Sequence, residues 1–467
     1  MDRTGHAAST RLRRRAALTL MVGIVCSALD AAVMSLALPG IARDLGVSAA
    51  SSVWVVNAFQ LVALGMLLPC AALGDRWGYR RVYIAGATLF ALASAVCMAA
   101  PDLPVLAAAR GLQGLGAASM MAINGALLRL IYPPELLARG LAINTAVVAF
   151  TSVCGPPMAA AVLSLTSWHG LFVPGVVLGP AVALLGARAL PSNPPRTAPA
   201  PALPLADVVL NMAMFGLFFV GAHLAGERPL HGADPGSVPG ASPWWAALLV
   251  AAAVAVGVFH VRRQWRRPEP LFPVDLLRIA VFRLSMCTSV CAFGAQTLAY
   301  ISLPFLLFEG WQRTPAEAGL LMAIWPLALM CTLPVITRLI GRHPSAVLGA
   351  LGLGGLALGL VVLALLPAAP TLTAIAVGMV LCGLGYGVFQ SPNNHTILTA
   401  APAPRAGAAG GMLSSARLTG QSLGAVLMVA VFNLAGAQQG SVLGLWLGAA
   451  LAVVAAVFSL MRLSSKS

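Results

Sequence analysis

Long apolar runs follow one another along the chain, separated by short polar segments. Within the runs, polar and apolar residues do not alternate as they do in the strands of a membrane barrel. A spanning helix needs about 20 mostly apolar residues, and backbone groups in lipid must hydrogen-bond within the protein. The pattern therefore predicts an all-α polytopic membrane protein. Its fourteen predicted spans cover residues 16–40, 52–74, 82–101, 104–128, 136–164, 168–190, 205–226, 244–262, 284–308, 316–341, 345–367, 370–393, 407–435 and 442–462.

Two polar stretches divide this series of spans. A proline-rich stretch, Pro191–Pro204, follows the sixth span, and an arginine-rich stretch, Arg262–Arg283, follows the eighth. They predict three parts: an N-terminal six-helix bundle over 1–190, a Pro-rich linker with two inserted spans and a cytoplasmic Arg-rich segment over 191–282, and a C-terminal six-helix bundle over 283–467.

A short pattern recurs in the two predicted bundles. Gly114-Leu115-Gly116 precedes Asn124 in the fourth span, and Gly383-Leu384-Gly385 precedes Asn393 at the same offset in the twelfth. Internal repeats of this kind are typical of transporters built from two six-helix halves. A chance match is an open alternative at this point. A true repeat would make the seventh and eighth spans an insertion.

The composition narrows the class of protein. Of 467 residues, 59% are hydrophobic and 9% are charged, against about 25% charged in ordinary globular chains. The net charge of +15 comes from arginines, among them Arg462, that cluster between the apolar runs. Their distribution predicts a multi-pass protein with both termini in the cytoplasm. It predicts no nucleic-acid partner, since no polar domain gathers the charge. The bias for arginine over lysine suggests a GC-rich bacterial genome, and the expected location is the bacterial inner membrane.

Asp30 is the acidic residue that lies deep within a predicted span. An ionised Asp at a helix centre costs about 2.5–3.5 kcal/mol on insertion scales. Burial penalises the charged form, so the carboxyl can take up a proton, and it can also attract a cation. The alternative is a structural ion pair with an arginine on a neighbouring helix, for which Arg110 in the fourth span is the candidate.

Polar side chains recur at helical spacing in several spans. Arg110, Gln113, Met121 and Asn124 share one face of the fourth span, which suits a cavity wall or, because small residues interleave, a packing face. Asn57 and Gln60 form a similar pair in the second span. The candidate substrate-cavity residues are Asn57, Gln60, Gln113, Met121, Asn124, Gln390, Asn393 and Arg417.

The loop after the second span carries a recognisable motif. Residues 71–81, read Ala-Ala-Leu-Gly-Asp-Arg-Trp-Gly-Tyr-Arg-Arg, resemble the cytoplasmic motif of the major facilitator superfamily, with Ala71 in place of its first glycine. The resemblance implies a gating motif in which the aspartate caps a helix start and pairs with arginines across a seam between the halves. Gly78 permits a tight turn. The motif residues are Gly74, Asp75, Arg76, Gly78, Arg80 and Arg81.

Other segments resemble the fourteen-span drug:proton antiporter branch of that superfamily. These are 29–39, 110–116, 267–271, 318–321 and 391–394. The resemblance implies that Asp30 and Arg110 serve in proton coupling. Gly155-Pro156 is similar to the antiporter motif of the fifth span. The usual flanking glycines of that motif are replaced by Thr151, Ala159 and Ala160.

Two departures from the branch concern the cargo. Members that export quaternary cations carry an aspartate where this chain has Asn57, and some carry acids in the thirteenth span where this chain has Arg417. A neutral side chain cannot balance a second positive charge. Neutral or monocationic lipophilic compounds, such as drugs or antiseptics, are therefore the expected cargo.

Together these patterns predict a proton-coupled efflux transporter that works by alternating access. Asp30 would exchange a proton for substrate, with Arg110 tuning it through charge. The expected partners are a small-molecule substrate, protons and the lipid bilayer, with the chain functional as a monomer and with no cofactor, metal or catalytic residue. Two alternatives stay open: a same-fold exporter of a dedicated metabolite such as a sugar, amino acid or siderophore, and a polytopic membrane enzyme or sensor. The seven scattered histidines do not favour an enzyme.

Overall fold

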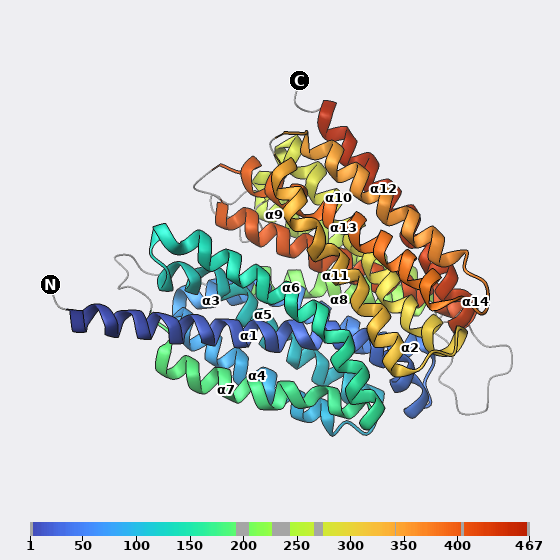
Figure 1. Cartoon of the computed structure of the whole chain (residues 1–467), viewed down its shortest axis with the longest axis horizontal. Helices are drawn as coiled ribbons and strands as arrows, with labels where there is room; N and C mark the ends of the chain where they lie inside the picture. The colour runs from blue at the N-terminus through green and yellow to red at the C-terminus, as the bar shows by residue number, and fades with distance from the viewer. Residues whose placement is uncertain are drawn as a thin grey trace. The chain divides into compact units, whose positions relative to one another are not determined.

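The computed structural model describes residues 3–192, 205–226, 243–265, 274–340, 342–402 and 406–464, and nearly all of them are helical (Figure 1). Most of the Pro-rich stretch and the 267–271 segment lie outside the described residues. The helices are α1 (Arg3–Asp44), α2 (Ala49–Ser52), α3 (Trp54–Trp77), α4 (Tyr79–Met98), α5 (Leu103–Ile131), α6 (Pro134–Leu165), η1 (Trp168–Phe172), α7 (Val173–Ala189), α8 (Leu205–Gly226), α9 (Pro243–Trp265), η2 (Val274–Arg278), α10 (Ala280–Phe305), η3 (Leu306–Gly310), α11 (Pro315–Leu339), α12 (Ser345–Ala364), α13 (Leu372–Ala400) and α14 (Ala406–Ser464).

Twelve of the described helices are long and apolar enough to cross a membrane. One of them, α14, consists of two segments joined at Gly436, whose φ is 71°. The chain reverses there, because Gly440 lies against Phe432 and Gly444 lies against Met428. In α8 the apolar stretch, Ala206–Phe218, is shorter than in the other spanning helices. The prediction of an all-α polytopic protein is confirmed.

The first helix extends well past its predicted span of 16–40. Helix α1 begins at Arg3 and ends at Asp44. Its N-terminal turns hold several arginines, and arginine is a good helix former. Hydropathy locates the part of a helix that lies in lipid, but it does not detect a polar continuation of the same helix outside the lipid.

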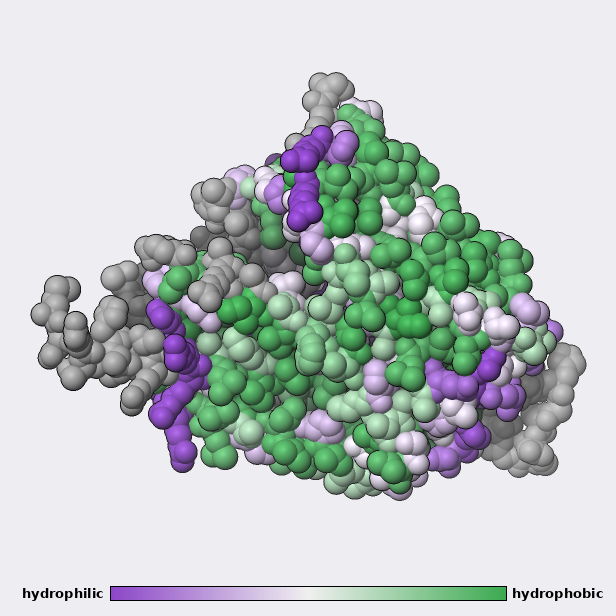
Figure 2. Space-filling view, in the orientation of Figure 1, coloured by the Kyte–Doolittle hydropathy of each residue, from purple (hydrophilic) through white to green (hydrophobic). Residues whose placement is uncertain are grey.

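Large apolar side chains are exposed along the helices. Examples are Leu165, Trp244 and Leu351, which are 84%, 82% and 67% exposed. Figure 2 shows hydrophobic residues over much of the visible surface, with hydrophilic residues gathered in a few patches. In a soluble protein an exposed hydrophobic surface of this extent would drive aggregation, whereas lipid is a suitable solvent for it.

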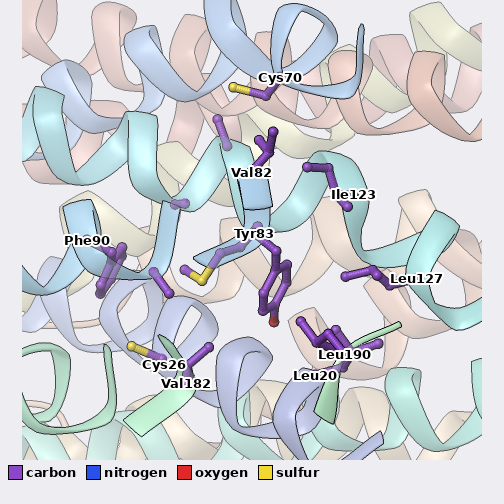
Figure 3. Packing of buried hydrophobic residues seen from close by; sticks show 14 of the residues in the cluster. Leu20, Cys26, Cys70, Val82, Tyr83, Phe90, Ile123, Leu127, Val182 and Leu190 are labelled. Carbon is purple, nitrogen blue, oxygen red and sulfur yellow. The ribbon is translucent and has the colours of Figure 1, made fainter. Parts of the chain in front are cut away.

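The chain divides into two compact units. Unit 1 comprises residues 1–34 and 58–208, and unit 2 comprises residues 35–57 and 209–467. In unit 1, α4 packs against both α5 and α7. Its core surrounds Tyr83, whose ring lies among Leu20, Ile123, Leu127 and Leu190 (Figure 3). In unit 2, α10 packs along α14, while α13 packs against α11 and α12.

The repeated glycines make the same contacts in the two units. In unit 1, a Cβ on Gly114 would lie 2.3 Å from the Phe59 carbonyl oxygen of α3, and one on Gly116 would lie 2.7 Å from Gly86 of α4. In unit 2, a Cβ on Gly383 would lie 2.3 Å from the Trp325 carbonyl oxygen of α11. Likewise, a Cβ on Gly385 would lie 2.3 Å from the Leu356 nitrogen of α12. The sequence repeat is therefore a repeat of helix packing.

Adding one methyl group at Gly383 should destabilise unit 2. We expect Gly383→Ala to lower the free energy of unfolding by about 1–3 kcal/mol, since the Cβ would overlap the α11 backbone. Gly354→Ala is the matched control, because a Cβ there meets no atom within 4 Å. Denaturation of both purified variants in detergent measures the difference. Equal stability of the two variants would contradict the packing argument.

Candidate functional site

The candidate site lies in unit 1, where α1 carries Asp30, α4 carries Ser94, and α5 carries Arg110 and Gln113. Helix α5 starts at a defined residue. The Asp102 carboxylate caps it by accepting a hydrogen bond from the Val105 backbone nitrogen at 2.9 Å. Arg110 and Gln113 are three residues apart on α5 and so lie on the same side of it. That side presents a guanidinium and an amide to Asp30 of α1.

Asp30 and Arg110 form a buried ion pair. Arg110 Nη1 lies 2.7 Å from Asp30 Oδ2, and the two residues are 2% and 7% exposed. The pairing expected from the sequence is thus present. An ion pair this deeply buried needs further hydrogen bonds to offset the loss of hydration.

Gln113 supplies those hydrogen bonds. Its Nε2 donates to Asp30 Oδ1 at 2.9 Å and to Ser94 Oγ at 2.9 Å, while its Oε1 accepts from Arg110 Nη1 at 2.5 Å. Ser94 in turn donates to the Phe90 carbonyl oxygen at 2.7 Å. We call Asp30, Ser94, Arg110 and Gln113 the unit-1 polar cluster. Both oxygens of the Asp30 carboxylate have partners within it.

Aromatic rings lie against the Arg110 guanidinium. Its central carbon lies 4.6 Å from the Phe59 ring centroid and 5.9 Å from that of Phe172. Such rings attract a cation and exclude water. The pair is therefore held in a low-polarity environment, where the charge state of Asp30 strongly affects the energy of Arg110. Protonating Asp30 would remove the negative partner of the guanidinium and oblige the cluster to rearrange.

Gly155 brings another helix close to Asp30. A Cβ on Gly155 of α6 would lie 2.5 Å from the Ala32 Cβ, two residues beyond Asp30 on α1. Pro156 and Pro157 follow within α6 and remove backbone donors from that region. Thus the Gly155-Pro156 motif lets α6 approach α1 beside the polar cluster.

The loop motif joins α3 and α4 by a sharp turn. Gly78 takes the N-cap position of α4 with a φ of 101°, a conformation that favours glycine. Asp75 lies in the last turn of α3 and accepts a hydrogen bond from the Tyr79 hydroxyl at 2.5 Å. The capping of a helix start by this aspartate stays a prediction. Arg80 donates to the Ala187 carbonyl oxygen at the end of α7.

The chain matches known transporters over most of its length. The Major Facilitator Superfamily profile matches residues 20–425. The chain belongs to the major facilitator superfamily. It is 46% identical to the uncharacterized transporter YebQ of Escherichia coli K12, over 97% of this chain and 96% of that one. It is 25% identical to the riboflavin transporter RibZ of Clostridioides difficile 630, over 88% and 87%. It is 29% identical to the multidrug resistance protein Stp of Mycobacterium tuberculosis CDC 1551, over 94% and 78%.

The polar cluster is specific to one half of this major facilitator transporter. Four residues before Gly114 stands Arg110, whereas four residues before Gly383 stands Met379. Gln113 corresponds in the same way to Cys382. Met379 and Cys382 are fully buried. Unit 2 therefore has the same helix packing with apolar side chains at these positions.

The expected cavity residues come from both units of the described structure. Gln113 belongs to the polar cluster, and the Asn124 amide donates to Asn144 Oδ1 at 2.9 Å. Met121 and Gln390 are half-buried. On α3, Asn57 Oδ1 and Gln60 Oε1 are buried without a hydrogen-bond partner among the described residues. In unit 2, the Nε atom of Arg417 also lacks such a partner.

Asn393 belongs to a second buried network in unit 2. Its Nδ2 donates to Ser289 Oγ at 2.7 Å, and its Oδ1 accepts from Arg462 Nη1 at 2.9 Å. Arg462 also donates to Ser285 Oγ at 3.0 Å. The arginine is 2% exposed, so it lies within the protein and not in an exposed loop. Both amide atoms of Asn393 are bound within the protein, which fits packing better than substrate contact.

Sequence reasoning missed Ser94 and the two rings on Arg110. Single serines and phenylalanines are common in apolar spans, so neither type stands out. A weak signal was available for Ser94, which lies within the predicted third span at a depth comparable to that of Asp30. Their contacts depend on how α4, α3 and η1 pack around α5.

Proposed function

We propose that the chain is a proton-coupled exporter of lipophilic small molecules. The observation that carries the proposal is the unit-1 polar cluster, in which a protonatable carboxyl is buried against an arginine and one neutral donor, the Gln113 amide. Structural ion pairs in membranes also occur. However, Met379 and Cys382 occupy the corresponding sites in unit 2, so this packing does not require an ion pair.

The proposed architecture follows the two-halved plan. Counting α8 and both segments of α14 gives fourteen spans, with N and C termini in the cytoplasm of a bacterium. A monomer with an N-terminal bundle over 1–190 and a C-terminal bundle over 283–467 would alternate between inward and outward access. The motif from Gly74 to Arg81 would act as the cytoplasmic gate. Protonation of Asp30 would weaken its attraction for Arg110 and so favour one of the two states.

The nature of the relatives supports transport but not one cargo. Stp is named a multidrug resistance protein, which is in line with the export of neutral or monocationic lipophilic compounds. RibZ is named a riboflavin transporter, which favours the second candidate, transport of one dedicated metabolite. Both candidates use the same coupling at Asp30, so coupling is tested first.

Inside-out membrane vesicles from cells expressing the chain test the proposal. Three dyes of different charge serve as probes: Nile red, ethidium and fluorescein. We expect at least one dye to accumulate when the vesicle lumen is acidified and to leave when an ionophore collapses the proton gradient. Vesicles from cells without the chain are the control. Accumulation that ignores the gradient, or that equals the control for all three dyes, would refute coupled export.

A further inference from the structure

Arg417 lies well inside its span and carries a charge that no acid described in unit 2 balances. It stands on α14 between Ala406 and the reversal at Gly436. Among the described residues of unit 2, its side chain has no ion-pair partner, and its buried Nε atom has no hydrogen-bond partner. The acids described in unit 2 all lie at helix ends, and they are Asp44, Asp275, Glu309 and Glu317. An arginine stays charged at any physiological pH. Its charge is therefore unbalanced within the described part of unit 2.

Arg417 lies on the side of α14 that faces away from an apolar groove of unit 2. That groove, of about 550 Å³, runs between α14 and the helices α8 and α9, and on α14 it is lined by Thr419, Ser422 and Leu423. With 100° of rotation per residue, Arg417 lies on the opposite side of α14 from Thr419 and Leu423. Gln421, one turn on, shares the face of Arg417. The guanidinium therefore belongs to the side of α14 that faces α10 and α13.

Two buried aromatic donors, Tyr386 and Trp325, lie on α13 and α11 of the same unit. One turn beyond Arg417, Gly420 packs on Phe293 of α10, and the Phe293 ring lies 5.9 Å between centroids from the Tyr386 ring of α13. Tyr300 lies against the Trp325 ring at 5.3 Å between centroids. The Tyr386 hydroxyl and the Trp325 Nε1 are buried, and neither has a hydrogen-bond partner among the described residues. Buried polar groups are normally satisfied, so these two donors are available to a ligand.

We propose that Arg417, Tyr386 and Trp325 recognise the anionic group of a transported organic acid, such as an aromatic carboxylate. The arginine fork binds a carboxylate with two hydrogen bonds, and the hydroxyl and indole N–H can donate to the same group. The rings of Tyr300 and Trp325 offer an apolar surface to the body of the molecule. The inference rests on the proposed transport function, and it changes the expected cargo from neutral or monocationic to anionic.

The comparison of the two units strengthens the assignment. Arg110 in unit 1 has its carboxylate in Asp30, which makes that site neutral in total. Arg417 in unit 2 has none among the described residues, so it can accept a carboxylate from outside the protein. Arg110 then pairs with the carboxyl that exchanges a proton, and Arg417 binds the anionic group of the substrate.

Binding to the purified full-length chain in phosphatidylcholine nanodiscs tests the inference without a proton gradient. The probes are 1-naphthoate, indole-3-acetate and salicylate, each paired with its amide. We expect at least one carboxylate to bind about tenfold or more tightly than its amide by calorimetry. Arg417→Gln should remove this preference, and Arg417→Lys should retain part of it. Arg338→Gln, at an exposed arginine in the last turn of α11, is the control that should retain it.

Further experiments distinguish an organic carboxylate from an inorganic anion and from a lipid headgroup. Competition by chloride or sulfate at equal concentration, or loss of carboxylate binding when phosphatidylglycerol is added, would overturn the inference in favour of an inorganic ion or a lipid headgroup. Equal binding of every carboxylate and its amide would also overturn it. Tyr386→Phe, which removes one hydroxyl, should weaken carboxylate binding severalfold even where Arg417→Gln does not fold. A carboxylate preference without gradient-driven transport would refute the proposed function and leave this inference standing.

Discussion

We expect Asp30→Asn to abolish proton-driven accumulation of substrate in inside-out vesicles. The substitution is nearly isosteric, and the asparagine oxygen can still accept from Arg110 while its neighbour Gln113 keeps its bond to Ser94. It removes the group that can gain and lose a proton. The variant also leaves the guanidinium charge permanently unbalanced, which holds the cluster in the arrangement that protonated Asp30 would have.

A second readout separates coupling from folding. Exchange of labelled for unlabelled substrate across the same vesicles needs alternating access but no net proton movement. We therefore expect Asp30→Asn to retain exchange while losing accumulation. Asp102→Asn is the matched control, because it makes the same chemical change at the exposed N-cap of α5, where asparagine caps as well as aspartate. Undiminished, still gradient-dependent accumulation by the Asp30 variant would refute its role in coupling.

The sequence was most informative for residue types whose transfer into lipid has a high free-energy cost. Asp30 could be singled out because the other acids lie near the ends of predicted spans, and its pairing with Arg110 followed from the presence of one arginine in a nearby apolar span. Membrane helices were predictable for the same reason, since hydropathy alone separates lipid from water. The repeated glycines were also visible, although their meaning needed the matching contacts with α3 and α11.

Contacts between distant segments were less predictable. Gln113 was expected to face substrate, yet its amide lies within the polar cluster, because Ser94 and Asp30 approach α5 from two other helices. Arg462 shows the limit of counting charges at span ends. The side chain of an arginine in the last turn of a helix can either extend into water or join a buried hydrogen-bond network. For Arg462 the positions of Ser285 and Asn393 decide between these two arrangements.

Replacing Arg110 with methionine should destabilise the protein far more than replacing both members of the pair. The single substitution leaves the Asp30 carboxylate buried without its cation. Breaking a buried ion pair in this way costs about 3–5 kcal/mol. We expect that loss in the free energy of unfolding of Arg110→Met, measured by denaturation in detergent at a pH where the carboxyl of the unfolded chain is ionised. Arg188→Met, at an exposed arginine near the end of α7, is the control and should be nearly neutral.

The double variant Asp30→Asn, Arg110→Met should recover most of that stability without recovering transport. Unit 2 supplies the physical reason, because Met379 fills the corresponding site between the same repeated glycine contacts and is fully buried. A buried asparagine that accepts a hydrogen bond from Gln113 destabilises the fold less than an unpaired buried carboxylate does. A double variant that is stable and inactive would assign the ion pair to coupling. If it were as unstable as the single variant, the pair would instead be needed to hold α1 against α5, and the argument from Met379 would fail.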